Sequence, residues 1–375
     1  MKKIIVILSI LLIMVAIYAI RVGAIREVIN EKNLVLLAQE NIKERESEET
    51  RISSLNFYGN ISERRDINAL IIGDSIAQSD GSSNVDKKWY NSIIKNTQKK
   101  YNLTMTTDLI TGVSATGVRS WVELNKANPT KKYDIAFICL GQNDQFNITP
   151  EQFGVFYESI IIKLKKLNPK IEIIPIIESS FREYNNYSNT IIALSKHYNL
   201  QYADALQAFN SSGYQIEGLL KDVVNPNDKG YNYYVTTIEK VINSNYKFNK
   251  KTGIKYSTFY NNTNKLINFV FDNSPDLNNG FILDNGFTGI KVGSTLTFNT
   301  THSVAIVDFL RQPNGGKFKV FIDANFVEEI DTNKTSQVGY SNLLSDNLEG
   351  KHKIRIEISS LAKSGTVKIF GLVTN

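Results

Sequence analysis

The sequence predicts an α/β domain with a parallel sheet, then an antiparallel β-sandwich, both behind an apolar N-terminal helix. Three observations support this. Apolar, β-branched runs alternate with helical stretches from about residue 68 to residue 245, which is typical of a parallel sheet covered by helices. After residue 245 the pattern changes to short strands separated by turn residues, as in a β-sandwich. The first twenty residues are almost entirely apolar.

Composition narrows the class of protein. The 375 residues are enough for two domains, each with its own core. The net charge of +6 comes from lysines scattered along the chain. This charge favours a weak attraction to acidic polymers. The absence of a basic stripe in the sequence argues against nucleic acid as a partner. Three histidines and a single cysteine, Cys139, argue against a metal site and exclude an internal disulfide. We expect no metal and no cofactor.

Residues 1–24 are predicted to be a membrane anchor or a signal segment. Two lysines precede an apolar run from Ile4 to Ile20, which Arg21 ends. The run is long for a signal-peptide core and just long enough to span a bilayer. We therefore predict a single-pass anchor in the cell membrane, with the bulk of the chain extracytoplasmic. Secretion after cleavage near Ala24 is the alternative. Residues 25–55 have mixed charge and helical character, which indicates a solvated stalk.

The α/β domain is predicted over residues 56–247. Its expected strands are Ala69–Ile72, Met105–Ile110, Ile135–Leu140, Ile171–Ile177 and a short one near Gln201–Ala203. Its expected helices lie around Lys87–Lys100, Pro150–Leu167, Tyr184–Tyr198 and Tyr231–Ile242.

The first of these strands ends in Gly73-Asp74-Ser75. Ligands of parallel sheets bind just outside the carboxyl ends of the strands. A serine hydroxyl placed there, before a helix, can reach a substrate. The alternative is an ordinary strand-to-helix turn capped by Asp74 or Ser75, because Gly-Asp-Ser is a short and common string.

Three further blocks follow in order. They are the glycine block Thr111-Gly112-Val113-Ser114-Ala115-Thr116-Gly117, then Gly141-Gln142-Asn143-Asp144, then Asp222-Val223-Val224-Asn225-Pro226-Asn227-Asp228-Lys229-Gly230-Tyr231. With Gly-Asp-Ser, this succession resembles the SGNH (GDSL-type) hydrolase superfamily over roughly Leu55 to Asn245. The resemblance implies a flavodoxin-like three-layer α/β/α domain that hydrolyses esters.

The resemblance also implies roles for individual residues. Ser75 would attack the ester carbonyl. Its backbone N–H, a backbone N–H from the glycine block at Gly112 or Ala115, and the Asn143 side chain would form the oxyanion hole. Asp222 would orient the catalytic base. The glycine that follows a serine in the family falls here on Ala115.

The last block departs from the family pattern, because the catalytic histidine falls on Asn225 and the glycine after the aspartate falls on Val223. A serine hydroxyl needs an adjacent base, and an asparagine amide cannot take up the proton. Asp222 itself, His302 from the β-domain or His197 from its helix could replace the base, although each histidine is more simply a surface residue.

The β-domain is predicted over residues 248–375, with strands such as Leu296–Asn299, Val304–Leu310, Lys317–Ile322, Lys353–Ile358 and Val367–Phe370. It loosely resembles the jelly-roll modules that accompany some carbohydrate esterases.

Two functions therefore remain open. The first is a membrane-anchored esterase or acyltransferase that acts on O-acyl esters of cell-surface carbohydrate, with catalysis impaired at Asn225. The second is an inactive protein of the same fold that binds acylated glycan or a protein partner. The expected partners are such a glycan and the membrane, not nucleic acid.

Overall fold

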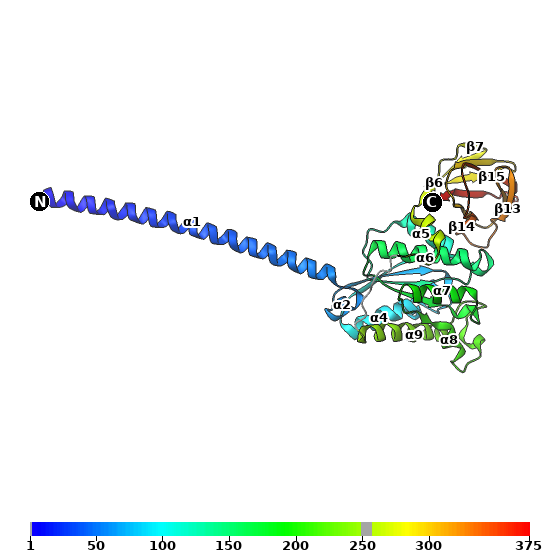
Figure 1. Cartoon of the computed structure of the whole chain (residues 1–375), viewed down its shortest axis with the longest axis horizontal. Helices are drawn as coiled ribbons and strands as arrows, with labels where there is room; N and C mark the ends of the chain where they lie inside the picture. Colours follow the sequence, from blue (N-terminus) through cyan, green and yellow to red (C-terminus); the bar gives the residue numbers. More distant parts are fainter. Residues whose placement is uncertain (1, 249–256) are drawn as a thin grey trace. The chain divides into compact units, whose positions relative to one another are not determined.

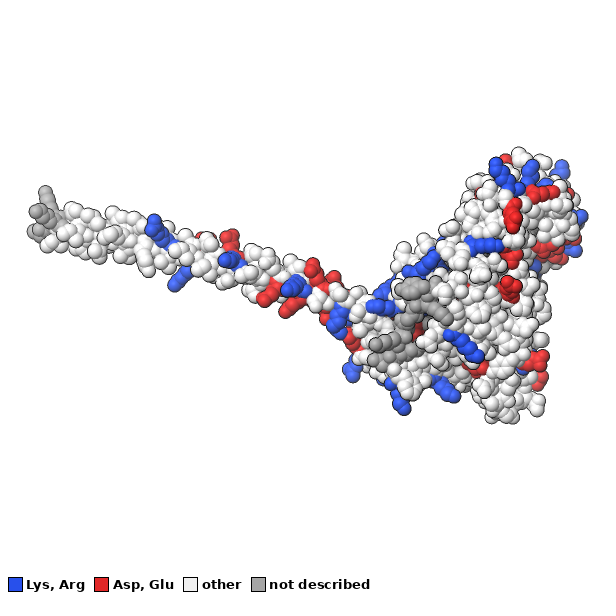
Figure 2. All heavy atoms as spheres, viewed as in Figure 1, with Lys and Arg blue, Asp and Glu red and all other residues white. Residues whose placement is uncertain are grey.

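The computed structural model describes residues 2–248 and 257–375, and the chain divides into two compact units, residues 1–55 and 56–375. The first unit is one continuous helix, α1 (Lys2–Ser54), drawn in Figure 1. The run from Ile4 to Ile20 carries no charged residue, and Figure 2 shows charged side chains of both signs on the part of α1 that follows this run. The large apolar side chains between Ile4 and Ile20 are 52–72% exposed. By length and composition this helix is a candidate membrane span or signal sequence.

We expect the full-length protein to fractionate with membranes and to keep its N-terminus when it is sequenced from them. The reason is the uninterrupted apolar run from Ile4 to Ile20, which loses contact with water when it enters lipid. A mature chain that begins at Ile25 would contradict the anchor and favour cleavage.

The α/β domain has the predicted parallel sheet. Its strands are β1 (Ile67–Gly73), β2 (Met105–Thr111), β3 (Ile135–Cys139), β4 (Glu172–Ile177) and β5 (Ala203–Asp204), in the order β2-β1-β3-β4-β5. This is the flavodoxin-like order. The central strands β1 and β3 are covered on both faces, which explains their continuous apolar runs.

Helices cover both faces of this sheet (Figure 1). They are α2 (Phe57–Ser62), α3 (Ser75–Gln78), α4 (Trp89–Tyr101), α5 (Gly117–Ala127), α6 (Pro150–Leu167), α7 (Asn186–His197), α8 (Ala205–Asn210) and α9 (Asp228–Lys247), with 3₁₀ turns η1 (Val85–Lys87), η2 (Asp144–Phe146), η3 (Ser179–Phe181), η4 (Ile216–Leu219) and η5 (Asn261–Ile267). Leu70 and Ile72 pack with α5, α6 and α7, whereas Ala69 and Ile71 pack with α4 and α9. Alternate residues of β1 thus face opposite layers.

The predicted antiparallel sheets follow. Their strands are β6 (Val270–Asp272), β7 (Leu277–Asn279), β8 (Phe281–Leu283), β9 (Phe287–Gly289), β10 (Thr295–Thr300), β11 (Ala305–Arg311), β12 (Lys317–Ile322), β13 (Asn325–Asp331), β14 (Val338–Ser345), β15 (His352–Ser360) and β16 (Val367–Thr374). One sheet has the order β13-β12-β15-β10-β7 and the other β14-β11-β16-β9-β8, with β6 paired to β16. Apolar residues from both sheets form a core of their own.

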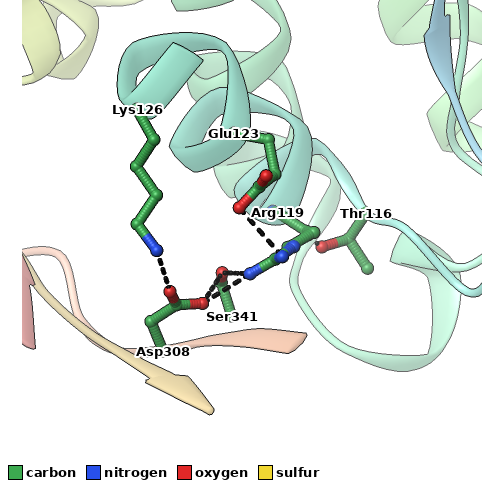
Figure 3. Close-up of polar contacts among 6 residues, drawn as sticks. All are labelled: Thr116, Arg119, Glu123, Lys126, Asp308 and Ser341. Atoms are coloured by element: carbon green, nitrogen blue, oxygen red, sulfur yellow. Dashed lines mark hydrogen bonds and ion pairs between the residues drawn. The ribbon is translucent and has the colours of Figure 1, made fainter. Parts of the chain in front are cut away.

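A buried ion cluster joins the two domains (Figure 3). Asp308 of β11 has an exposed fraction of 0%. Arg119 Nη1 lies 2.5 Å from Asp308 Oδ1, and Lys126 pairs with Oδ2. Both cations lie on α5, and the Ser341 hydroxyl donates to Asp308 at 2.8 Å. The β-domain is therefore packed firmly against the helix that follows the glycine block.

Candidate active site

Ser75 lies at the carboxyl edge of the central strand β1. At Gly73 φ is +157°, and a Cβ atom would lie 2.1 Å from the Cys139 carbonyl oxygen. Because glycine has no Cβ, it lets β1 and β3 approach each other at this point. Asp74 caps α3 by accepting from the Ile76 N–H at 2.8 Å. Ser75 is half-buried, and its hydroxyl makes no hydrogen bond within residues 2–248 and 257–375. The hydroxyl is thus available to a ligand.

Asp222 and Asn225 form a hydrogen-bonded pair in the loop between η4 and α9. The Asn225 side-chain amide donates to Asp222 Oδ2 at 3.0 Å, and its backbone N–H donates to Oδ1 at 2.7 Å. Val224 N–H donates to the same Oδ1 at 2.8 Å. Burial acts to raise the pKa of Asp222, but the hydrogen bonds from Asn225 and Val224 outweigh it, so this pKa is lowered. Asp222 is a weak proton acceptor.

The Asn225 loop packs against the loop that follows Ser75. A Cβ atom on Gly81 would lie 2.0 Å from the Pro226 carbonyl oxygen and 3.1 Å from Asn225 Cβ. Asn225 Oδ1 is buried and has no hydrogen-bond partner in the described part of the chain. Asn225 thus presents an acceptor, which can receive a hydrogen bond from a hydroxyl but cannot remove its proton. No direct hydrogen bond joins Asn225 and Ser75 among the described residues, so their predicted contact stays a prediction.

The three groups expected to form the oxyanion hole differ in whether their N–H already has an acceptor within the protein. The Ser75 N–H has no acceptor among the described residues. The Ala115 N–H, in contrast, donates to the Gly112 carbonyl at 2.9 Å. The Asn143 amide donates to Asp74 Oδ2 at 3.0 Å and to the Ala115 carbonyl at 3.1 Å. A substrate oxygen would have to compete with these internal bonds, which weakens transition-state stabilisation.

The β-domain reaches the glycine block directly. Lys334, in the turn between β13 and β14, donates to the Ser114 hydroxyl at 2.8 Å, and Ser114 has a left-handed φ of +62°. A groove of about 400 Å³ runs beside this contact, lined by Gly112, Ala115 and, from the β-domain, Val338. Both domains therefore border the space next to the glycine block.

Three buried carboxyl groups lie behind Ser75, and sequence analysis did not single them out as a cluster. Burial raises the pKa of Asp74 and of Asp144 to about 7. Burial and the nearby Asp74 raise the pKa of Glu178 well above its usual range. Asp144 Oδ1 accepts from the Gly117 N–H at 2.8 Å, whereas its Oδ2 has no partner among the described residues. The folded state therefore favours the protonated forms of these three carboxyl groups.

We expect the free energy of unfolding of the 56–375 fragment to fall as pH rises from about 4 to about 7, by up to about 1.4 kcal/mol per pH unit for each such carboxyl group. The sign follows because Asp74 and Asp144 hold their protons to about pH 7 when folded but only to about pH 4 when unfolded. Urea unfolding at several pH values measures this. Asp144→Asn should flatten the curve, and an unchanged slope in that variant would contradict the assignment.

Asp80 is a further carboxylate in the loop that follows Ser75, and the sequence did not single it out. Its backbone N–H donates to the Ser75 carbonyl at 3.0 Å. Burial raises the pKa of Asp80, Lys88 lowers it and the nearby Asp222 raises it further. Its side chain makes no hydrogen bond within the described ranges. Only its spacing of five residues after Ser75 could have suggested it.

The two histidines considered as replacement bases lie elsewhere. His197 Nε2 contacts the Ser257 carbonyl at 2.7 Å, and the ring packs edge-on against Tyr198 and Phe259. His302 lines a cavity of the β-domain that contains no residue of the four blocks. Neither imidazole is positioned beside Ser75, Asp222 or Asn225.

Comparison with known proteins agrees with this architecture. Residues 71–233 match the GDSL-like Lipase/Acylhydrolase family. A two-domain esterase described as active on acetylated mannans superposes with a TM-score of 0.73 and 14% identity, over 84% of this chain and 92% of that chain. A second structure of that esterase, co-crystallised with mannopentaose, gives the same TM-score and identity over 84% of this chain and 93% of that chain. No curated protein matches. The likeness shows that both domains share the esterase's fold.

Proposed function

We propose that this chain, a GDSL-like α/β domain joined to an antiparallel β-sandwich, is a membrane-anchored extracytoplasmic protein that acts on O-acyl esters of cell-surface carbohydrate, with impaired catalysis. The family match over residues 71–233 supports ester chemistry. The fold shared with an esterase active on acetylated mannans supports an acylated glycan as the ligand. The apolar beginning of α1 supports the anchor.

The proposal of impaired catalysis rests on one observation, the hydrogen-bonded pair of Asn225 and Asp222. The Asn225 amide donates to Asp222 Oδ2 at 3.0 Å, as the imidazole of a catalytic triad donates to its carboxylate. The other end of the amide is an oxygen, which cannot accept the Ser75 proton. Serine hydrolases that lose one triad member keep only about 10³–10⁴-fold catalysis over water. We therefore expect slow ester cleavage.

The internal hydrogen bonds of Ala115 and Asn143 also favour slow ester cleavage. Each must break or bend before its N–H can reach a substrate oxyanion. Ester binding needs neither a base nor a complete oxyanion hole, so the groove beside the glycine block can still hold an acylated sugar. This favours, as the second candidate, an inactive protein of the same fold that binds acylated glycan or a protein partner.

The length of α1 fits a polymer at the cell surface. The helix continues from Arg21 to Ser54 beyond the apolar run, which at 1.5 Å per residue corresponds to about 50 Å. A helical spacer of this length favours a substrate in a polymer layer outside the membrane over a membrane lipid as substrate.

The test compares O-acetylated polysaccharides, acetylated mannan among them, with the same polymers after chemical deacetylation. The 56–375 fragment forms its own compact unit and serves as the soluble probe. We expect an acetylated polymer to retain the fragment, with acetate released slowly, and the deacetylated polymer to retain it less. Equal retention by the two forms would show that the acyl group is not recognised.

A further inference from the structure

We propose that a cavity at one end of the β-sandwich binds an anionic carbohydrate, one that carries carboxylate or phosphate groups. The cavity has a volume of about 710 Å³, within the range of small-ligand sites. All of its lining residues lie between residues 270 and 374. It contains none of the four blocks, so it is separate from the Ser75 site.

The polar lining includes two lysines and two histidines. Lys351, Lys353, His302 and His352 line the cavity together with Asp272 and Asp323. The Lys351 and Lys353 amines and the His302 ring have no hydrogen bond or ion pair in the described part of the chain. Three potential donors thus remain for a ligand.

The two acidic residues are already engaged within the protein. Asp323 Oδ2 lies 2.6 Å from His352 Nδ1, and Asp323 Oδ1 accepts from the Lys353 N–H at 2.8 Å. Asp272 Oδ1 accepts from the Ser274 N–H at 2.9 Å. Since His352 also contacts the Glu349 carbonyl at 2.8 Å, both ring nitrogens face acceptors, which stabilises the positively charged imidazolium.

The rest of the lining suits a sugar better than a bare anion. Phe271 and the exposed Val270 supply apolar contact for the faces of sugar rings, and the exposed Thr301 supplies a hydroxyl group. Lysine amines bind carboxylate and phosphate groups as point charges. A polymer that carries both acyl esters and anionic groups could occupy this cavity and the groove beside the glycine block through different segments.

The test uses the full-length protein in detergent micelles and isothermal titration at low salt. The probes are an oligogalacturonate for carboxylate, a glycerol-phosphate oligomer for phosphate, and neutral mannopentaose. At least one anionic probe should bind about tenfold more tightly than mannopentaose; the oligogalacturonate alone would identify the ligand group as carboxylate, and the phosphate oligomer alone as phosphate. Equal or tighter binding of mannopentaose, or no binding of either anionic probe, would overturn the proposal.

Two pairs of charge reversals assign the binding to the cavity. The Lys351→Glu/Lys353→Glu variant should lose about tenfold in affinity for the anionic probe. The matched variant Lys291→Glu/Lys363→Glu changes the same charge on exposed lysines of the same domain that do not line the cavity, and its affinity should fall clearly less. His302→Ala, which preserves both lysines, should also weaken binding. Equal losses in the two double variants would show a general charge effect and contradict the site.

Discussion

Replacing Asn225 by histidine in the 56–375 fragment is expected to raise the rate of p-nitrophenyl acetate hydrolysis by about 10²–10⁴-fold, the range for a well-placed general base. Asp222 already holds the Asn225 amide at 3.0 Å, so it can orient an imidazole at the same position. The new base would accept the Ser75 proton, which Asn225 cannot do. Because the N–H groups of Ala115 and Asn143 have internal partners, we expect the lower part of this range.

The controls test whether the gain passes through the serine. Ser75→Ala in the Asn225→His background should abolish the added rate. Val223→Gly restores the glycine that the family has after the aspartate; Val223 is 81% exposed, so its removal costs little packing, and it should increase the gain. An increase that survives Ser75→Ala, or no increase in either variant, would contradict the assignment of Asn225 to the base position.

Replacing Asp308 by alanine is expected to lower the free energy of unfolding by about 3 kcal/mol, the lower end for removing one partner of a buried ion pair. The exposed fractions of the Arg119 and Lys126 side chains are only 17% and 26%. Without Asp308, Lys126 would lose the carboxylate it pairs with, and Arg119 would keep its pair with Glu123 at 2.8 Å but lose its partner in the β-domain. Urea unfolding of the 56–375 fragment at constant pH measures the loss.

Asp331 provides the matched control, because it is also an aspartate of the β-domain that faces a lysine. Its carboxylate lies 4.0 Å from Lys317, and both side chains are about half exposed. Asp331→Ala should therefore cost less than about 1 kcal/mol. Similar losses in Asp308→Ala and Asp331→Ala would show that the buried cluster does not stabilise the contact between the domains.

Local sequence patterns predicted much of the fold. The apolar runs of β1 and β3 are continuous because helices bury both of their faces, and the change to short strands predicted the antiparallel sheets, which begin at β6 (Val270–Asp272). The order of the four blocks predicted that Ser75 follows the carboxyl end of β1, where ligands of parallel sheets bind. The Asp222–Asn225 pair lies in the loop before α9, and its role beside Ser75 stays a prediction.

Contacts between distant segments could not be predicted in this way. Arg119 and Asp308 are 189 positions apart. The local sequence around either residue does not predict that the two form an ion pair. The internal hydrogen bonds of Asn143 depend on how the Ala115 turn is folded, which the sequence blocks do not specify. Asp80 stands outside every block, and only the folding of its loop brings it near Asp222.

The comparison of wild type with Ser75→Ala tests the central claim most directly. Both proteins, as 56–375 fragments, are assayed with p-nitrophenyl acetate at equal concentration. If Ser75 is the nucleophile and Asn225 stands in the base position, as proposed, hydrolysis should be slow in both proteins, with rates that agree within about twofold. A wild type that is fast, depends on Ser75 and loses its activity in Asp80→Asn or Asp222→Ala would show that another carboxylate supplies the base, and would contradict the impairment at Asn225.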